Sequence, residues 1–562
     1  MPEQKSGGWR EGALLFSLAL LLRLLFWRAT PDAAWGWSAV FKGDAPVWLA
    51  YAQALQRGEL FELGLPLRPP GVAYLLAFLW NGETSGLAWP RFAWLVMGAL
   101  LAPLVYAATV RSFGLPVART AGWITAVATG PLLLSSSLNN ETPYLVVVLA
   151  SFVLFEDARR REPPLLFWSA LQALACLLRV EHALFALLAF PLLARTRRRV
   201  ALGLGAFLLP LVPWHLSAWR ALDRLNTMEP IRPPATEQAF RSVEGTLGGM
   251  SWTPDAARRR EALPAFARRP ASLFVGATVA WRGRSEVVEG DLEILDEAFG
   301  SLPEPLPRRP FVASYGSLNF ALANHEGARG GFARGPLDAP PPLSGGSTRY
   351  PPYLVAGLPP PGLALEYPPH LELLIHGYRI GGEWIRSDPW AFARLVVRKL
   401  RRSWEGASLG LTGYNWPLGL SGTRRAVDLV TPDPGPLSAA WSVGVLVLVV
   451  AGAWRGRRSP PLQPWLLYVA SKLAVAALFF GYARQGSLML PALALFAALT
   501  LARFVPRTRR GLVLILALPL VLELSRLLAA PVIHIDGRPV ETSDPWPGDL
   551  HHDQRIDVEV FS

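Results

Sequence analysis

The chain has 562 residues, of which 51% are hydrophobic and only 17% are charged, and its mean hydropathy is +0.28. This composition is typical of a membrane protein rather than a soluble globular one. The formal net charge of +13 would suit a nucleic-acid-binding protein, but much of the arginine excess stands in short clusters between apolar runs, where membrane topology explains it. The single cysteine, Cys176, excludes an intramolecular disulfide and a thiolate metal cluster.

The apolar runs predict an α-helical polytopic membrane protein with about eleven transmembrane helices, since one span takes ~20 residues. The first run, 11–28, follows a basic N-terminus, and we interpret it as a signal anchor whose N-terminus lies in the cytosol. The later runs lie at 92–110, 119–137, 142–156, 165–179, 182–194, 200–218, 438–454, 463–480, 488–503 and 511–529.

Clusters of arginine follow every second apolar run, so all of them fall on the cytosolic side if the spans alternate. They are Arg111 with Arg119, Arg159–Arg161, Arg195 with Arg197–Arg199, Arg455 with Arg457 and Arg458, and Arg503 with Arg507, Arg509 and Arg510. This topology divides the chain into 1–28 (N-terminus and first span), 29–91 (first external loop), 92–218 (membrane block), 219–437 (large external domain), 438–529 (second membrane block) and 530–562 (external tail).

Three shorter helices are predicted outside these spans. Residues 47–55 have helical spacing of Trp48, Tyr51 and Leu55, and 70–80 is apolar but too short to cross comfortably. We interpret both as helices at the membrane surface. Residues 388–404 begin with Asp388 as N-cap and Pro389 at the first position, and their basic, amphipathic pattern predicts an interfacial helix.

The first external loop carries one acid and one cation in positions suited to chemistry. Asp44 stands in Gly43-Asp44-Ala45-Pro46, and Arg68 follows in Arg68-Pro69-Pro70. A carboxylate can take a proton from a hydroxyl, and a guanidinium can hold a phosphate leaving group. The alternative interpretation is that Asp44 is an ordinary turn residue, because glycine, aspartate and proline favour turns.

A second polar group, Arg179-Val180-Glu181, separates the runs 165–179 and 182–194. Charged residues at such a depth are tolerated only against protein or a wet cavity. The sequence leaves two interpretations open: Arg179 and Glu181 form a structural ion pair, or they face a cavity that opens outward.

Several separated motifs resemble those of one family in their order and outer-side placement. They are Gly43-Asp44, Arg68-Pro69-Pro70, Arg91 at the start of the next span, Asn139-Asn140-Glu141-Thr142-Pro143, Arg179-Val180-Glu181, Asn319–Phe332 and Arg484–Pro491. With these motifs the chain resembles the polytopic GT-C glycosyltransferases, in the bacterial dolichyl-phosphate-mannose protein mannosyltransferase-like group that includes the lipid A aminoarabinose transferases. It departs from the family pattern at Ala45, where some members have a second acid, and at Ala323, Glu326 and Gln485.

The resemblance implies a GT-C-like fold and an inverting glycosyltransferase that uses a polyprenyl-phosphate sugar as donor. It implies Asp44 as the general base and Arg68 and Arg484 as ligands of the donor phosphate. The residues expected to shape the cavity are Arg91, Glu141, Arg179, Glu181 and Asn324. The acceptor would be a hydroxyl of a lipid, glycan or protein, at the external face of a bacterial inner membrane. No cofactor or metal motif stands in the sequence, and a divalent cation is not indicated.

Three other functions remain open at this point. A transporter or flippase of lipid-linked sugars would share the spans and the buried arginines, although we find no inverted repeat of the kind such proteins often show. An O-antigen ligase or polymerase would share the large external loop, and a non-catalytic envelope scaffold would need no reactive group. Asp44 discriminates among them, because only the glycosyltransferase requires its carboxylate while folding stays intact.

Overall fold

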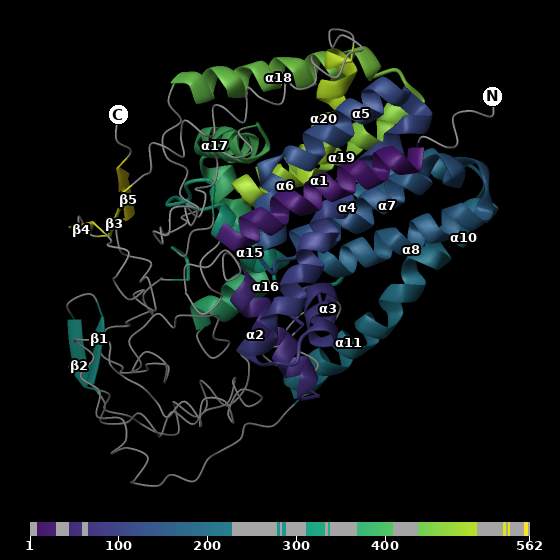
Figure 1. The fold of residues 1–562 in the computed structure, drawn as a ribbon. Helices are drawn as coiled ribbons and strands as arrows, with labels where there is room; N and C mark the ends of the chain where they lie inside the picture. Colours follow the sequence, from purple (N-terminus) through teal and green to yellow (C-terminus); the bar gives the residue numbers. More distant parts are fainter. Residues whose placement is uncertain are drawn as a thin grey trace.

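The computed structural model is mainly helical (Figure 1). It describes residues 8–29, 44–58, 66–227, 278–281, 284–287, 311–331, 335–337, 368–408, 436–502, 532–535, 538–539 and 556–559. The strands in these ranges are short. β1 (Thr278–Trp281) pairs antiparallel with β2 (Arg284–Val287), and β3 (Val532–Ile535) pairs antiparallel with both β4 (Arg538–Pro539) and β5 (Ile556–Glu559).

The helices fall into two groups along the chain. Those before residue 228 are α1 (Gly8–Ala29), α2 (Ala45–Gln56), α3 (Gly71–Leu79), η2 (Thr84–Leu87), α4 (Ala88–Phe113), α5 (Leu115–Val127), α6 (Thr129–Ser136), α7 (Glu141–Arg160), α8 (Glu162–Leu178), α9 (His182–Leu193), α10 (Arg197–Leu208), η3 (Leu209–Leu211) and α11 (Val212–Thr227). Those after residue 310 are α15 (Gly316–Ala323), α16 (Pro368–Ser387), α17 (Pro389–Ser408), α18 (Pro436–Gly456), η9 (Pro460–Leu462), α19 (Gln463–Leu478) and α20 (Ala483–Leu501).

Within the described ranges, three helices are long and apolar enough to cross a membrane, namely Ala88–Phe113, Arg197–Asp223 and Arg484–Leu501. The pair Leu115–Val127 and Gly130–Ser136 is bent by 54° and would make a fourth if it is one span. The predicted spans 165–179 and 182–194 form the apolar helices α8 and α9, which have 17 and 12 residues and are shorter than a usual crossing. The predicted span 511–529 lies outside the described residues, so the number eleven stays a prediction.

Local sequence explains several helix boundaries. Proline stands at the first or second position of α2, α5, α8 and α19, where its missing N–H is not needed. Gly114, with φ +81°, ends α4 and allows α5 to begin at once. Asp388 caps α17, because its Oδ1 accepts the Ala391 N–H at 2.8 Å. The predicted cap of this helix is confirmed.

The predicted surface helices pack more deeply than expected. The apolar side of α2 is covered by protein rather than left for lipid, since Trp48 and Tyr51 are buried in the main core. One side of α3 is also buried, while Phe78 on its other side is exposed. In α17 the buried side carries Lys399, and Val397 is exposed. Amphipathic spacing predicted these helices, but their apolar sides pack against other helices of the protein.

Aromatic packing joins the first helical group to the second. Phe152 of α7 stacks on Trp465 of α19, with ring centroids 4.0 Å apart and planes at 12°. Phe185 of α9 meets the ring of Tyr468, also on α19, edge-on at 5.5 Å. Helix α20 packs against α17, α18 and α5, and α18 lies along the outside of the bundle (Figure 1).

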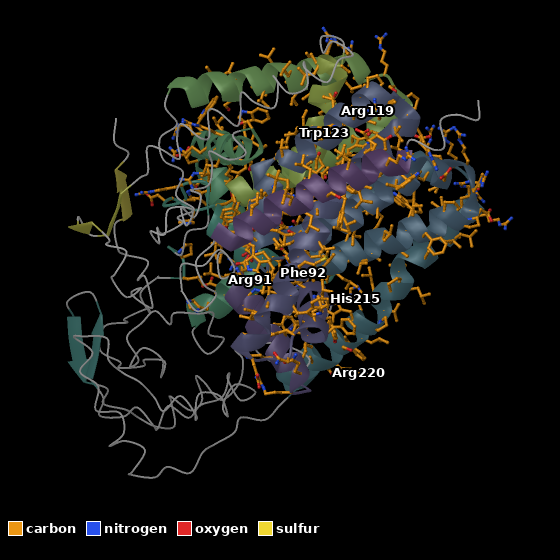
Figure 2. All side chains as sticks on the ribbon, viewed as in Figure 1. Arg91, Phe92, Arg119, Trp123, His215 and Arg220 are labelled. Atoms are coloured by element: carbon orange, nitrogen blue, oxygen red, sulfur yellow. The ribbon has the colours of Figure 1, made fainter. Side chains whose placement is uncertain are left out.

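Ion pairs hold the two arginines of the first predicted cluster at one end of the bundle. Arg111 at the end of α4 pairs with Asp157 near the end of α7 at 3.1 Å. Arg119 of α5 pairs with Glu11 of α1 at 3.3 Å. Figure 2 shows Arg119 near the top of the helical body and Arg91, at the start of α4, well below it. The opposite end of α7, which begins at Glu141, therefore lies on the side away from these arginines.

Candidate functional site

Asp44 immediately precedes α2 but does not cap it with its side chain. Its backbone N–H donates to Asn139 Oδ1 at 3.0 Å, which brings the Asn139–Pro143 motif to the first external loop. Its carboxylate accepts a hydrogen bond from Arg484 Nη2 at 2.8 Å. The side chain of Asp44 is 42% exposed, so this acid is both held by the protein and reachable. Asp44 lies in a turn, as the ordinary-turn interpretation expects, and it also forms an ion pair with Arg484.

Arg484 is brought to Asp44 from 440 residues along the chain. It stands in the first turn of α20, and its Nη1 lies 3.7 Å from Glu141 Oε1. The ring of Tyr482, the N-cap residue of α20, lies 5.4 Å from the guanidinium carbon. Arg484 therefore bridges the half-exposed Asp44 and the buried Glu141.

Arg179 lies in the short turn between α8 and α9 and joins two further acids. Its Nη1 donates at 2.9 Å both to Glu141 Oε1 and to Asn140 Oδ1. Its Nε donates to Glu181 Oε1. Glu141 is only 1% exposed, and a carboxylate at that depth requires cationic partners. Arg179 and Glu181 form the ion pair that one interpretation predicted, and the cavity that opens outward stays a prediction.

These contacts continue inward to a lysine. Lys472 of α19 is buried, and its Nζ lies 3.6 Å from Glu181 Oε1. Six groups of alternating sign therefore follow one another from the core to the half-exposed acid, and we name them the ion-pair chain. In order they are Lys472, Glu181, Arg179, Glu141, Arg484 and Asp44.

The ion-pair chain sets the protonation of Asp44 and Glu181. Burial raises the pKa of Asp44, but Arg484, by charge and hydrogen bond, together with the charges of Arg68 and Arg179, holds the pKa below its usual value. Burial likewise raises the pKa of Glu181, and the charges of Arg179 and Lys472 outweigh it and lower the pKa to about 2. Both acids are therefore carboxylates at neutral pH.

Arg68 and Tyr315 border the same site. The Tyr315 N–H donates to Leu67 O at 3.3 Å, which ties the first external loop to the segment before α15. Burial raises the pKa of the Tyr315 phenol, and the charges of Glu181 and Asp44 raise it further. Burial raises the pKa of the Tyr482 phenol in the same way. Both phenols beside the charged groups are therefore uncharged at neutral pH.

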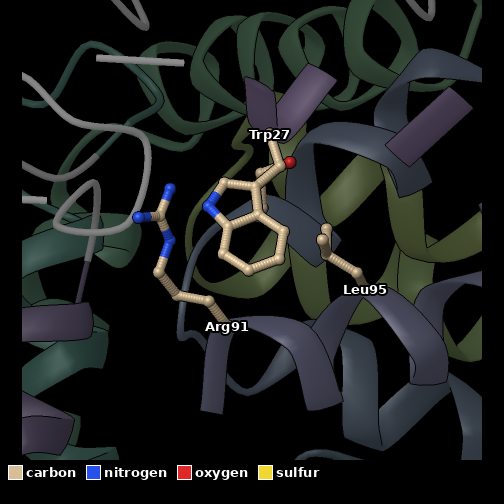
Figure 3. Close-up of a pocket in the computed structure, with 4 residues that line it drawn as sticks. Trp27, Arg91 and Leu95 are labelled. Atoms are coloured by element: carbon tan, nitrogen blue, oxygen red, sulfur yellow. The ribbon is translucent and has the colours of Figure 1, made fainter. Parts of the chain in front are cut away.

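Arg91 and Asn324 have partners elsewhere in the described structure. The guanidinium carbon of Arg91 lies 5.1 Å from the centre of the Trp27 ring, and with Leu95 and Ser136 these residues line a small pocket with room for about one water molecule (Figure 3). The Asn324 amide nitrogen donates to Leu478 O, and its oxygen accepts from Lys399 Nζ, each at 2.8 Å. Asn324 therefore joins the end of α15 to α17 and α19 by hydrogen bonds. Its role in shaping the substrate cavity stays a prediction.

Within the described residues, no group of three or more His, Cys, Asp or Glu side chains is arranged to hold a metal ion. Comparison of the chain with protein-family models, curated proteins and solved structures finds no match. The family resemblance therefore rests on the short motifs alone.

Lys472 is the site residue that the sequence prediction missed. It stands inside the apolar run 463–480, where the run was interpreted only as a span. A signal was present, because a lysine within a membrane-length apolar run is energetically expensive and needs a partner. The partner is Glu181, in the turn between α8 and α9, and the sequence around Lys472 does not indicate it.

Proposed function

We propose that this protein is a membrane glycosyltransferase that moves a sugar from a polyprenyl-phosphate donor to a hydroxyl acceptor with inversion. The observation that carries the proposal is the pair formed by Asp44 and Arg484. A half-exposed carboxylate and a guanidinium meet where the first loop and a late helix come together. One group suits proton removal and the other suits a phosphate.

In the proposed reaction Asp44 takes the proton of the acceptor hydroxyl. The hydroxyl oxygen attacks the anomeric carbon, the bond from that carbon to the phosphate oxygen breaks, and its electron pair leaves with the lipid phosphate. Attack from the face opposite the leaving group inverts the carbon. Arg484 and Arg68 would bind the phosphate oxygens and stabilise the negative charge that grows on them.

The observed ion pair adds a condition to this mechanism. With Arg484 bound, Asp44 has a lowered pKa and is a weak base. A donor phosphate would compete for the guanidinium, and the charge that holds the pKa of Asp44 down would be partly neutralised. Asp44 would then become a stronger base when the donor is in place, which would link donor binding to proton removal.

The arginine distribution supports a site on the external face. The pairs Arg111–Asp157 and Arg119–Glu11 mark one end of the bundle, and Asp44, Glu141 and Arg484 lie at the other. By the positive-inside rule the first end faces the cytosol. We therefore place the site at the external face of a bacterial inner membrane, where a lipid-linked donor and an envelope acceptor would meet.

The direct test is transfer from a labelled polyprenyl-phosphate sugar in membrane vesicles. We expect Asp44→Asn to lose at least about 100-fold of the wild-type rate, since a positioned general base contributes that much. Asp157→Asn is the matched control, because Asp157 is an ion-paired acid at the opposite end of the bundle. Full activity of Asp44→Asn at matched protein levels would contradict the assignment.

A transporter or flippase of lipid-linked sugars is the second candidate. The observation that favours it is the helix broken by 54° between Leu115–Val127 and Gly130–Ser136, since transporters build binding sites at broken helices. Movement of a labelled lipid-linked sugar across proteoliposomes without transfer to any acceptor would favour this function. Transfer that depends on Asp44 would favour the glycosyltransferase.

A further inference from the structure

Lys472 has an unusual environment for an amine. It lies in the middle of the apolar helix α19 and is buried, yet its Nζ donates no hydrogen bond within the described residues. Its ion-pair partner there is Glu181, at 3.6 Å. The rings of Tyr144 and Tyr468 lie 4.5 Å and 5.8 Å from Nζ, so the amine stands between one carboxylate and two aromatic faces.

Neighbouring residues fix this environment. Tyr144 OH lies 2.8 Å from His182 Nδ1, and His182 Nε2 lies 2.7 Å from Gln172 Oε1. Tyr468 OH donates to Leu488 O at 3.0 Å. The two rings beside the amine are thus held from α8, α9 and α20. An amine with so few polar contacts contributes little as a hydrogen-bond donor, and what it adds to this place is a positive charge.

That charge completes the balance of the ion-pair chain. With Lys472, the chain has three cations and three anions. Without it, Glu181 keeps Arg179 as its ionic partner in the chain, and Arg179 must also neutralise the buried Glu141. Arg179 would be drawn toward Glu181, Glu141 would draw more on Arg484, and Arg484 would be less available to Asp44.

We propose that Lys472 is a positioning residue of the transfer site, which holds Arg179 and, through Glu141, Arg484 in the arrangement that keeps Asp44 ionised. The proposal rests on the proposed glycosyltransferase function for its kinetic consequence, but its electrostatic consequence holds for any function. Lys472 touches no substrate in this scheme.

Other charged and titratable groups near the two ends of the ion-pair chain also affect the electrostatics of Asp44 and Lys472. Those facing Asp44 from the surrounding elements are Arg484, Arg68, Arg179, Glu141, Tyr315 and Tyr482. Those facing Lys472 are Glu181, Arg179, Tyr144, Tyr468, His182 and Cys176. Apart from Asp44, Glu141 and Glu181, the groups in these two sets are cations or neutral side chains. The extra cation, Arg68, acts on Asp44 at the far end of the ion-pair chain, so the loss of Lys472 leaves Glu181 and Glu141 to share Arg179 at the inner end.

The test compares Lys472→Met with wild type and with Lys399→Met in the full-length protein. Lys399 is a matched control, because it is a buried lysine whose Nζ donates to Asn324 and Ala477 rather than to the ion-pair chain. For Lys472→Met we expect kcat to fall on the order of 2- to 30-fold, the range for network residues that touch no ligand. We also expect the acidic limb of the pH–rate profile to move to higher pH.

The double variant Lys472→Met with Glu181→Gln restores the balance, since it leaves two cations and two anions, and the introduced amide oxygen can still accept a hydrogen bond from Arg179 Nε. We expect its acidic limb to return to the wild-type position. A purely structural lysine would lower melting temperature in both variants without any shift of this limb.

A second readout needs no activity. The difference in melting temperature between wild type and Asp44→Asn, measured against pH in detergent, reports how far ionised Asp44 stabilises the fold. That contribution is present above the unfolded pKa of about 3.9 and is lost as pH falls through the lower folded pKa. In the Lys472→Met background we expect a smaller difference that is lost at higher pH. The same curve in both backgrounds overturns the proposal, whether or not the wild type transfers sugar.

Discussion

At the scale of single residues, the proposed mechanism depends most on the carboxylate of Asp44. It is ionised at neutral pH, half-exposed, and paired with a guanidinium that the proposed donor would also bind. Its base strength therefore depends on what else binds Arg484. Neutralising Arg484 would raise the pKa of Asp44, because burial raises this pKa and Arg484 is the first group that opposes the effect of burial.

Because neutralising Arg484 would raise the pKa of Asp44, we expect the pH profiles of kcat/KM and kcat to differ. The value of kcat/KM reports the free enzyme, in which Arg484 lowers the pKa of Asp44, whereas kcat reports the complex. We expect the acidic limb of kcat/KM to lie below about pH 4, the ordinary aspartate range, and that of kcat to lie at higher pH. Coincident limbs would mean that the donor leaves the Asp44–Arg484 pair intact.

A second residue-scale prediction concerns Arg179, which neutralises two buried acids. Arg179→Met leaves Glu141 without its closest cation and Glu181 with Lys472 alone in the ion-pair chain. Removing one partner of a buried ion pair costs about 3–5 kcal/mol. We expect a clear fall in melting temperature, with Arg198→Met as control, because the Arg198–Glu162 pair is largely exposed. Equal melting temperatures for the two variants would show that the ion-pair chain does not stabilise the fold.

At the scale of elements, close packing of α17 on α20 holds Arg484 in place. A Cβ on Gly486, two residues after Arg484, would collide with the carbonyl of Ser403 on α17. Just before α20, a Cβ on Gly481 would collide with the carbonyl of Lys399. The backbones of the two helices touch at these glycines, so the direction of α20 at the site depends on them.

Gly486→Ala should therefore destabilise the protein and reduce transfer, although alanine favours a helix over glycine by about 0.5–1 kcal/mol. Gly444→Ala is the matched control, since it lies in α18 with open space around its Cβ position. We expect the control to raise melting temperature slightly and the Gly486 variant to lower it. A rise in both would mean that α17 and α20 can separate without consequence.

At the scale of the whole molecule, the proposed function requires that the two ends of the bundle face opposite sides of a membrane. Helix α4 has 26 residues and is about 39 Å long, which is enough to cross a bilayer. Asn81 lies just before its start on the side of the site, and Arg111 lies near its other end. Cys176, the one native thiol, is buried in α8, so introduced cysteines can be labelled selectively.

We expect Asn81→Cys to react with an impermeant thiol reagent from the outside of intact cells, and Arg111→Cys to react only after the membrane is opened. Both positions are exposed, so reactivity reports the side rather than burial. The wild-type protein, with only Cys176, is the background control. Labelling of both cysteines from the same side would contradict the crossing of α4 and with it the placement of the site.

The sequence by itself determined the largely helical fold with apolar helices long enough to cross a membrane, the helices at 47–55, 70–80 and 388–404, and the cap at Asp388. It could do so because periodicity, composition and capping act within a few residues. It also singled out Asp44, Arg68, Arg179, Glu181, Glu141 and Arg484 as candidates. Only the tertiary structure decided that Arg484 reaches Asp44, that Asn324 binds Lys399, and that Lys472 ends the ion-pair chain. Those contacts join segments far apart in the chain, 440 residues in the case of Asp44 and Arg484, and the packing of α7, α19 and α20 rather than any local propensity brings such charges together.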